Sequence, residues 1–248
     1  MSRTRGGAEG LGRTGSILSG LAVALGCVLF LGGFVWGAVV YQPYTVPTES
    51  MTPTISSGDR VLAERIDGSQ VRRGDVVVFT DSTWGALPMV KRVVAVGGDK
   101  IACCTDGKLT VNGKQIDEPY LQSGKPASAT GIPRTTVPQG RLFLLGDERS
   151  GSLDSTVHLE DAAHGSVPLS AVTARVDAVA WPLKGMLDHP TNFQDLPGGT
   201  SSPGPLNTVL VVIAAGAALV LGGAAWGPLA RRRAARGRRN PGELAGAR

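Results

Sequence analysis

The chain has 248 residues and a formal net charge of +5, which is enough length for one ordinary domain with attachments. The positive charge lies at the two ends. Residues 206–248 hold seven arginines and one glutamate, whereas residues 41–205 hold 15 Lys or Arg against 18 Asp or Glu. A nucleic-acid-binding domain needs a basic face, so this mildly acidic middle region argues against nucleic acid as a partner.

The first element expected is a membrane-spanning helix over residues 15–40, preceded by a basic tail over residues 1–14. Ile17–Val40 is a mostly apolar run of 24 residues, and a helix of this length crosses the hydrocarbon core of a bilayer. A cleaved secretory signal is the alternative. We prefer a permanent anchor, because the run is longer than the apolar part of a signal and no Ala-x-Ala site follows it closely.

A second membrane-spanning helix is expected over residues 206–229, followed by a basic tail over residues 230–248. The run RRRAARGRR after this apolar segment is typical of a stop-transfer anchor rather than of a buried core helix. Because positive residues remain in the cytoplasm, both tails are predicted to be cytoplasmic and residues 41–205 to face outward.

Between the helices, the sequence predicts a mainly β domain of antiparallel sheets over residues 41–195, followed by a Gly/Pro/Ser linker over residues 196–205. Short Val-rich runs separated by turn residues predict strands over residues 61–64, 75–80, 89–96, 141–146 and 167–181. Asn112-Gly113 lies between two β-type segments and indicates a hairpin. The Gly/Pro/Ser/Thr-rich stretch 122–140 is expected to be a loop.

Cysteines and histidines are too few to indicate a disulfide framework or a metal site. Cys103 and Cys104 are adjacent, and the sequence leaves their redox state open. His158 follows Ser152 and Asp154, but the chain has no G-x-S-x-G nucleophile motif. Polar residues of a surface loop are therefore a better interpretation than a Ser-His-Asp triad.

A serine nucleophile without histidine needs another base, and Lys91 has a suitable setting. It lies in MVKRVVAV, residues 89–96, among apolar residues that favour β-structure. Burial against such residues lowers the pKa of a lysine and leaves its amine neutral. An outward-facing strand position and an ion pair are the alternatives that this pattern leaves open.

Four stretches in order resemble the signature boxes of the type I signal peptidases. PTESMTPT (47–54) is similar to their nucleophile box, GDRVLAE (58–64) to a Gly-Asp strand box, KRVVAVGGD (91–99) to the general-base box and GDERSGSLDST (146–156) to the last box. The resemblance covers about residues 41–185. It implies a signal-peptidase-like β fold and a Ser/Lys protease of the bacterial plasma membrane, without cofactor or metal.

The resemblance also implies roles for individual residues. Ser50 matches the nucleophile, Lys91 the general base, Thr48 the hydroxyl that assists the Ser50 N–H in the oxyanion hole, and Ser152 the serine that orients the lysine amine. The supporting polar network is matched by Asp147, Arg149 and Asp154. The apolar substrate pockets are matched by Val46, Pro47, Met51, Ile55, Met89 and Val90.

Two residues depart from the family pattern. Glu148 stands where asparagine is usual, and Thr156 stands where an arginine often follows Asp-Ser. The second departure removes the usual arginine partner of Asp154, so we expect Arg149 to take its place. Neither departure affects the expected nucleophile or base.

The implied function is cleavage of signal peptides from secretory preproteins after small residues, in an A-x-A pattern, through an acyl-enzyme on Ser50. The expected partners are preproteins and the lipid bilayer, and the chain is expected to be a monomer. Two other functions fit part of the pattern. One is a self-cleaving Ser/Lys regulatory protease, and the other is a membrane-anchored β-domain of the cell envelope without enzymatic activity.

Overall fold

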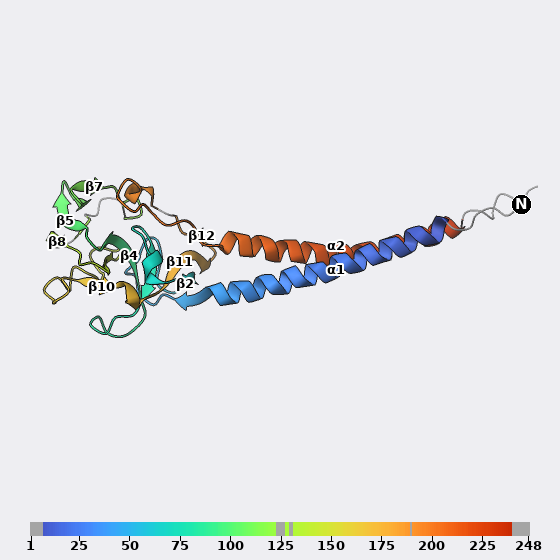
Figure 1. The fold of residues 1–248 in the computed structure, drawn as a ribbon, viewed down its shortest axis with the longest axis horizontal. Helices are drawn as coiled ribbons and strands as arrows, with labels where there is room; N and C mark the ends of the chain where they lie inside the picture. Colours follow the sequence, from blue (N-terminus) through green and yellow to red (C-terminus); the bar gives the residue numbers. More distant parts are fainter. Residues whose placement is uncertain (1–6, 123–126, 129–130, 189, 240–248) are drawn as a thin grey trace, which may run out of the picture. The chain divides into compact units, whose positions relative to one another are not determined.

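The computed structural model describes residues 7–122, 127–128, 131–188 and 190–239. Its contacts divide the chain into two compact units. One unit contains the two terminal helices, and the other is a β-rich unit from Val40 to Gly204 (Figure 1).

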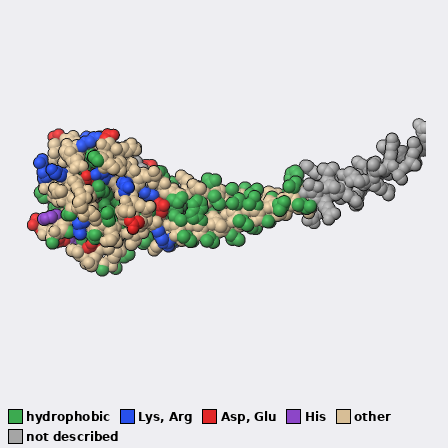
Figure 2. All heavy atoms as spheres, in the orientation of Figure 1, with side chains coloured by type: hydrophobic (Ala, Val, Ile, Leu, Met, Phe, Trp, Pro, Cys, Tyr) green, Lys and Arg blue, Asp and Glu red, His purple; other side chains and the backbone are tan. Residues whose placement is uncertain are grey.

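Two long helices form the first unit, α1 from Gly7 to Val40 and α2 from Leu206 to Arg239. Each contains a stretch long and apolar enough to cross a membrane, Gly15–Val40 and Leu206–Pro228. Apolar side chains lie all along the coloured part of these helices in Figure 2. Both helices extend beyond the expected membrane spans into the expected tails. For α2 the reason is that alanine and arginine, which dominate the sequence after Pro228, both favour helix.

Small residues allow these two antiparallel helices to approach closely. A β-carbon built on Gly26 would lie 2.8 Å from the backbone oxygen of Gly216. Ser19 Oγ donates a hydrogen bond of 2.7 Å to the backbone oxygen of Gly223. Such close packing and interhelical bonding are the main sources of helix association in a membrane.

An antiparallel eight-stranded sheet forms the centre of the second unit, in the order β1-β2-β11-β3-β4-β9-β10 with β12 beside β11. Its strands are β1 (Tyr41–Thr45), β2 (Arg60–Arg65), β3 (Val76–Phe79), β4 (Met89–Val96), β9 (Arg141–Leu145), β10 (Ser166–Pro168), β11 (Val172–Trp181) and β12 (Gly185–Met186). The predicted mainly β, antiparallel fold class is confirmed.

A second, four-stranded sheet has the order β7-β6-β5-β8. Its strands are β5 (Lys100–Thr105), β6 (Lys108–Val111), β7 (Lys114–Ile116) and β8 (Ile132–Thr136). The predicted hairpin is confirmed, because Asn112 and Gly113, both with positive φ, join β6 to β7. Cys103 and Cys104 are joined by a disulfide.

Strand β8 corrects the prediction that residues 122–140 form one loop. Thr135 and Thr136 pair with Ile101 and Lys100 of β5. Threonine is β-branched and fits a strand, although the Gly, Pro and Ser around it are typical of loops. Short 3₁₀ turns complete the described part of this unit, over Gly68–Gln70 (η1), Leu169–Ala171 (η2) and Thr191–Phe193 (η3).

The middle of the large sheet, around β3 and β4, is buried on both faces. Val78 packs into one core cluster and its neighbour Val77 into another, because successive strand residues point to opposite faces. A third cluster joins the small sheet to the large one, with Ile101 packed in the same cluster as Phe143. The segment expected to be a linker also contacts this unit, since Leu196 is buried in that third cluster.

Candidate active site

Ser50 lies in a turn after β1 that is fixed by backbone hydrogen bonds on two sides. At its start, the Val46 N–H donates to the backbone oxygen of Asp59 over 2.9 Å, and the Gly58 N–H donates to that of Val46 over 2.8 Å. At Ser50 itself, the backbone oxygen accepts the N–H of Glu148 at 3.1 Å. The turn is therefore held between the start of β2 and the loop after β9.

Strand β4 places Lys91 directly beside Ser50, although the two residues are 41 positions apart. Lys91 Nζ is 2.8 Å from Ser50 Oγ and 3.1 Å from the backbone oxygen of Val90. Only 4% of Lys91 is exposed. This burial lowers the pKa of Lys91 from 10.5 to about 8, and the charges of Asp154 and Asp147 oppose the shift. A large share of the amine is therefore neutral at mildly alkaline pH.

Thr48 completes this polar group. Its Oγ1 lies 3.2 Å from Ser50 Oγ. In the described part of the chain, the backbone N–H of Ser50 donates to no acceptor. A hydroxyl and a free backbone N–H therefore lie next to the Ser50 oxygen.

A cavity of about 110 Å³ opens beside Ser50 and Lys91. Four of the six predicted pocket residues line it, namely Val46, Pro47, Met89 and Val90. The sequence reasoning missed four more lining residues, Tyr44, Thr45, Val78 and Pro88. Met51 and Ile55 do not line it, because both are fully buried in a core cluster.

Ser152 lies near the nucleophile turn but not where it was predicted to act. Its Oγ is buried and has no hydrogen-bond partner among the described residues, so the expected bond to the Lys91 amine is not present. Instead, Ser152 lies against Gly146. A β-carbon on Gly146 would collide with Ser152 Oγ and with the Ser50 backbone oxygen.

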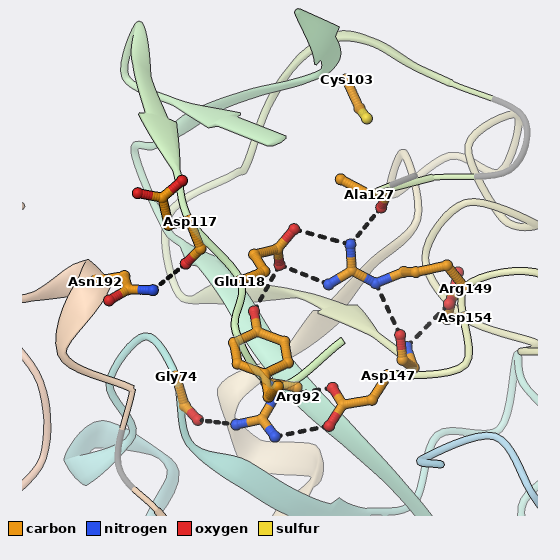
Figure 3. A network of polar contacts seen from close by, with 12 residues as sticks. Gly74, Arg92, Cys103, Asp117, Glu118, Ala127, Asp147, Arg149, Asp154 and Asn192 are labelled. Atoms are coloured by element: carbon orange, nitrogen blue, oxygen red, sulfur yellow. Dashed lines mark hydrogen bonds and ion pairs between the residues drawn. The ribbon is translucent and has the colours of Figure 1, made fainter. Parts of the chain in front are cut away.

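Asp147 is paired with Arg92, a residue that the sequence reasoning did not single out (Figure 3). Arg92 Nε and Nη2 donate to the two oxygens of Asp147 over 2.8 and 2.7 Å. Thr54 Oγ1 donates to Asp147 over 2.5 Å and so ties this pair to the nucleophile turn. Burial lowers the pKa of Arg92, but the Asp147 carboxylate raises it more.

Arg149 is paired with Glu118, which corrects the predicted contact between Arg149 and Asp154. Its Nη2 and Nη1 donate to the Glu118 carboxylate over 2.6 and 3.1 Å, and its Nε donates to the backbone oxygen of Gly146 over 2.9 Å. Tyr120 joins the same group through a 2.5 Å bond to Glu118 and through its ring, 3.9 Å from the Arg92 guanidinium (Figure 3). Sequence reasoning missed Glu118 and Tyr120 because no short motif marks them.

Asp154 is stabilised by neutral donors instead of an arginine. Its carboxylate accepts a hydrogen bond of 3.0 Å from the backbone N–H of Gly146. It accepts two more from Thr156, of 3.0 Å from the backbone N–H and 2.7 Å from the Oγ1 hydroxyl. Thr156 therefore supplies a hydroxyl where an arginine is usual. His158 forms no triad with Ser152 and Asp154, because its Nδ1 bonds to Asp161.

Three comparisons place these features among known proteins. Residues 17–181 match the family model described as signal peptidase, peptidase S26. A probable signal peptidase I of Mycobacterium leprae is 34% identical over 200 residues, covering 58% of this chain and 69% of the relative. Signal peptidase I of Bacillus caldolyticus is 35% identical over 158 residues, covering 58% of this chain and 82% of the relative. A crystal structure of a signal peptidase I from Enterococcus faecalis covers 47% of this chain and 96% of that chain, at 22% identity and a TM-score of 0.34.

These matches define a class, a serine endopeptidase that is also a membrane protein with two apolar helices. The chain belongs to the signal peptidase family, peptidase S26. The resemblance that the four sequence boxes indicate is confirmed.

Proposed function

We propose that the protein cleaves signal peptides from exported preproteins with Ser50 as nucleophile and Lys91 as general base. The observation that carries this proposal is the 2.8 Å contact between Ser50 Oγ and Lys91 Nζ. The pKa of Lys91 is lowered to about 8 by burial, so the amine is available to accept the Ser50 proton.

The reaction follows from this geometry in two steps. Ser50 Oγ attacks the carbonyl carbon of the scissile bond while Lys91 Nζ takes its proton, and the Ser50 N–H and Thr48 hydroxyl stabilise the oxyanion. The C–N bond then breaks as Lys91 returns the proton to the leaving amine. The mature protein departs, and the signal peptide remains as an ester on Ser50. Water activated by Lys91 hydrolyses that ester and restores the free serine.

The start of β4 offers a backbone edge for the substrate. Met89, Val90 and Lys91 pair with β3, whereas the pairing of β4 with β9 begins only at Arg92. An extended substrate can add a strand along the unpaired side, as in other β-augmentation complexes. The small apolar cavity beside it would accept only small side chains at the first and third positions before the cut, in the A-x-A pattern.

The charge distribution supports a specific orientation in a bacterial plasma membrane. Arginines precede the first apolar span and follow the second. Both termini are therefore placed in the cytoplasm and the β-domain on the opposite side of the membrane. In this orientation Ser50 lies ten residues after the end of the first apolar span and works on preproteins still anchored in the bilayer. A monomer supplies every residue of this proposed mechanism.

The test is to incubate the purified full chain with a preprotein in detergent and identify the new N-terminus by mass spectrometry. We expect one cut after a small-x-small sequence, and no cut when the third residue before it is phenylalanine. Ser50→Ala and Lys91→Ala should abolish the cut, whereas Lys108→Ala, at an exposed lysine, should not. Near-normal cleavage by Lys91→Ala would exclude the proposed dyad.

The same assay separates the two other functions. A non-enzymatic envelope domain predicts no cleavage by any variant. A self-cleaving regulator predicts fragments of this chain only, with the preprotein intact.

A further inference from the structure

A second cleft lies at the opposite end of β4 from Lys91. It has a volume of about 260 Å³ and is formed where the turn after β4, the turn before β9 and residues 197–198 meet. Val96, the last residue of β4, lines it, so it lies about 17 Å along the strand from Lys91. It shares no lining residue with the cavity beside Ser50.

Two arginines in this cleft have no carboxylate partner among the described residues. Arg72 Nη1 donates to the backbone oxygens of Ser69 and Val71 over 2.8 and 2.9 Å. Arg141 Nε donates to the Ser166 hydroxyl over 2.8 Å and to the Ser166 backbone oxygen over 3.2 Å, and Nη2 donates to the same backbone oxygen over 2.6 Å. Carbonyl and hydroxyl oxygens hold a guanidinium in position without cancelling its charge. Both arginines also keep N–H groups that donate to no described residue.

Arg72 and Arg141 are half-buried, and their surroundings differ from those of the fully buried arginines. Four arginines of the β-domain each have a carboxylate partner: Arg73, Arg92, Arg149 and Arg175. The lining of the cleft contains no aspartate or glutamate. Asp75 lies close in sequence but does not line the cleft. Its carboxylate accepts the backbone N–H of Arg72 and the hydroxyl of Ser201, and its charge raises the pKa of Arg175. Two positive charges therefore line this cavity, and no carboxylate among the described residues lines it with them.

Besides the two arginines, the cleft is lined by neutral polar groups, glycine backbone, the Asp99-paired Arg73 and four apolar residues, Val71, Val96, Leu169 and Pro197. The Gln139 amide and the Ser69 hydroxyl line it, and neither side chain forms a hydrogen bond within the described part of the chain. A β-carbon on Gly97 would lie 3.0 Å from the backbone of Gln139 and Gly140, so glycine is what lets the two turns meet here. Two guanidinium groups, an amide and a hydroxyl around one space suit the several oxygens of a phosphate.

We propose that this cleft binds a phosphate group, carried either by inorganic phosphate or by the headgroup of an anionic phospholipid. A water molecule occupies roughly 30 Å³ in the liquid, so 260 Å³ holds a phosphate with a small polyol attached. Bound there, the ligand would contact the end of β4, the start of β9 and the segment that leads to α2. The site is separate from the proposed signal-peptide site and does not depend on it.

The test is titration calorimetry on the purified full chain in detergent, with inorganic phosphate and glycerol 3-phosphate at constant ionic strength. A lipid arm compares phosphatidylglycerol with phosphatidylcholine in mixed micelles. Arg72→Gln and Arg141→Gln should each weaken phosphate binding by about tenfold or more, because each removes a charge-assisted donor. Arg134→Gln, at an exposed arginine outside the cleft, should bind like the unmodified chain.

The outcomes distinguish the two sources. Equal affinity for inorganic phosphate and glycerol 3-phosphate, with no preference between lipids, identifies free phosphate as the ligand. Preference for phosphatidylglycerol that is lost in Arg72→Gln identifies a lipid headgroup. Absence of binding to every phosphate probe, or an equal loss in Arg134→Gln, overturns the proposal.

Two controls guard against a folding defect. Preprotein cleavage should be unchanged in the cleft variants, because they lie outside the Ser50 site. If Arg141→Gln lowers the thermal unfolding midpoint, the comparison of Arg72→Lys with Arg72→Gln replaces it as the test of the cleft. Arg72→Lys keeps the positive charge and should bind phosphate more tightly than Arg72→Gln.

Discussion

Lys91 and Arg92 are neighbouring buried basic residues on β4, yet the pKa of Lys91 is lowered and that of Arg92 is raised. They point to opposite faces because strand residues alternate. Lys91 bonds to a serine hydroxyl and a backbone oxygen, and burial lowers its pKa to about 8. Arg92 binds both oxygens of Asp147, and its pKa is raised. Burial is similar for both, so the directly bonded carboxylate decides the difference.

This contrast shows how one strand serves both reactivity and stability. The carboxylates whose charges act on Lys91 are those of Asp154 and Asp147, and both accept hydrogen bonds from other residues. They raise the pKa of Lys91 without outweighing desolvation. Arg92 binds the Asp147 carboxylate and Thr156 binds that of Asp154, so neither carboxylate forms an ion pair with the Lys91 amine.

Replacing each cation by methionine tests this contrast most directly. Lys91→Met removes the proposed base and keeps apolar bulk, so cleavage should fall by at least about 10³-fold. Its urea unfolding should be unchanged or shifted to higher urea, because a desolvated amine is removed. Initial cleavage rates and urea titration measure both effects, with Lys108→Met as the control at an exposed site.

Arg92→Met should instead act on stability. It leaves the Asp147 carboxylate buried without its cation, which costs about 3–5 kcal/mol in the free energy of unfolding. Urea denaturation of the full chain measures this loss, and Arg92→Met combined with Asp147→Leu should recover part of it. If Arg92→Met and Lys91→Met had equal stability, the two cations would not differ as described.

Thr48 tests the oxyanion side of the site. Thr48→Val keeps the shape and removes the hydroxyl, so kcat should fall by about 10²-fold while unfolding is unchanged. Thr48→Ser should restore most of the rate. A full rate in Thr48→Val would remove Thr48 from the proposed mechanism.

The lowered pKa of Lys91 sets the sign of the pH dependence. Below pH 8 the amine is protonated and cannot accept the Ser50 proton, so kcat/KM should rise with pH and level off above about pH 8. Each unit below this value should cost about tenfold. A pH–rate profile measures this, and a flat profile between pH 6 and pH 9 would contradict a lysine base.

The smallest expected effect concerns Thr156. Thr156→Val removes one hydrogen bond to Asp154 and should cost about 1 kcal/mol of stability. Thr156→Ser should show no loss. Urea titration separates the two variants.

Local sequence patterns could predict much of this fold. Val-rich runs and the Asn112-Gly113 turn fix backbone geometry over a few residues, so β4 and the β6–β7 hairpin were predictable. β8 was not, because its threonines lie among loop-forming residues and its pairing with β5 is set at a distance. Both helices continue past the membrane spans expected over residues 15–40 and 206–229, since charged residues limit a membrane span but not a helix.

The site was predictable where a motif covers it and not elsewhere. The sequence boxes around Ser50 and Lys91 were enough to predict this pair. Met51 and Ile55, in contrast, belong to the core, so an apolar residue in a motif need not line the substrate pocket. The ion pair of Arg92 had one sequence signal, because Arg92 follows Lys91 in an apolar strand where a buried arginine needs a carboxylate partner. Glu118 offered none, since its bond to Arg149 joins segments far apart in the sequence.

Gly146 contributes no functional group, yet it limits how this enzyme can change. Ser152 and the Ser50 carbonyl occupy the space where its side chain would be. Every single-base change that replaces a glycine adds at least one carbon, so no small evolutionary step is open at this position. Variants at residue 146 should therefore be strongly depleted in a library selected for secretion.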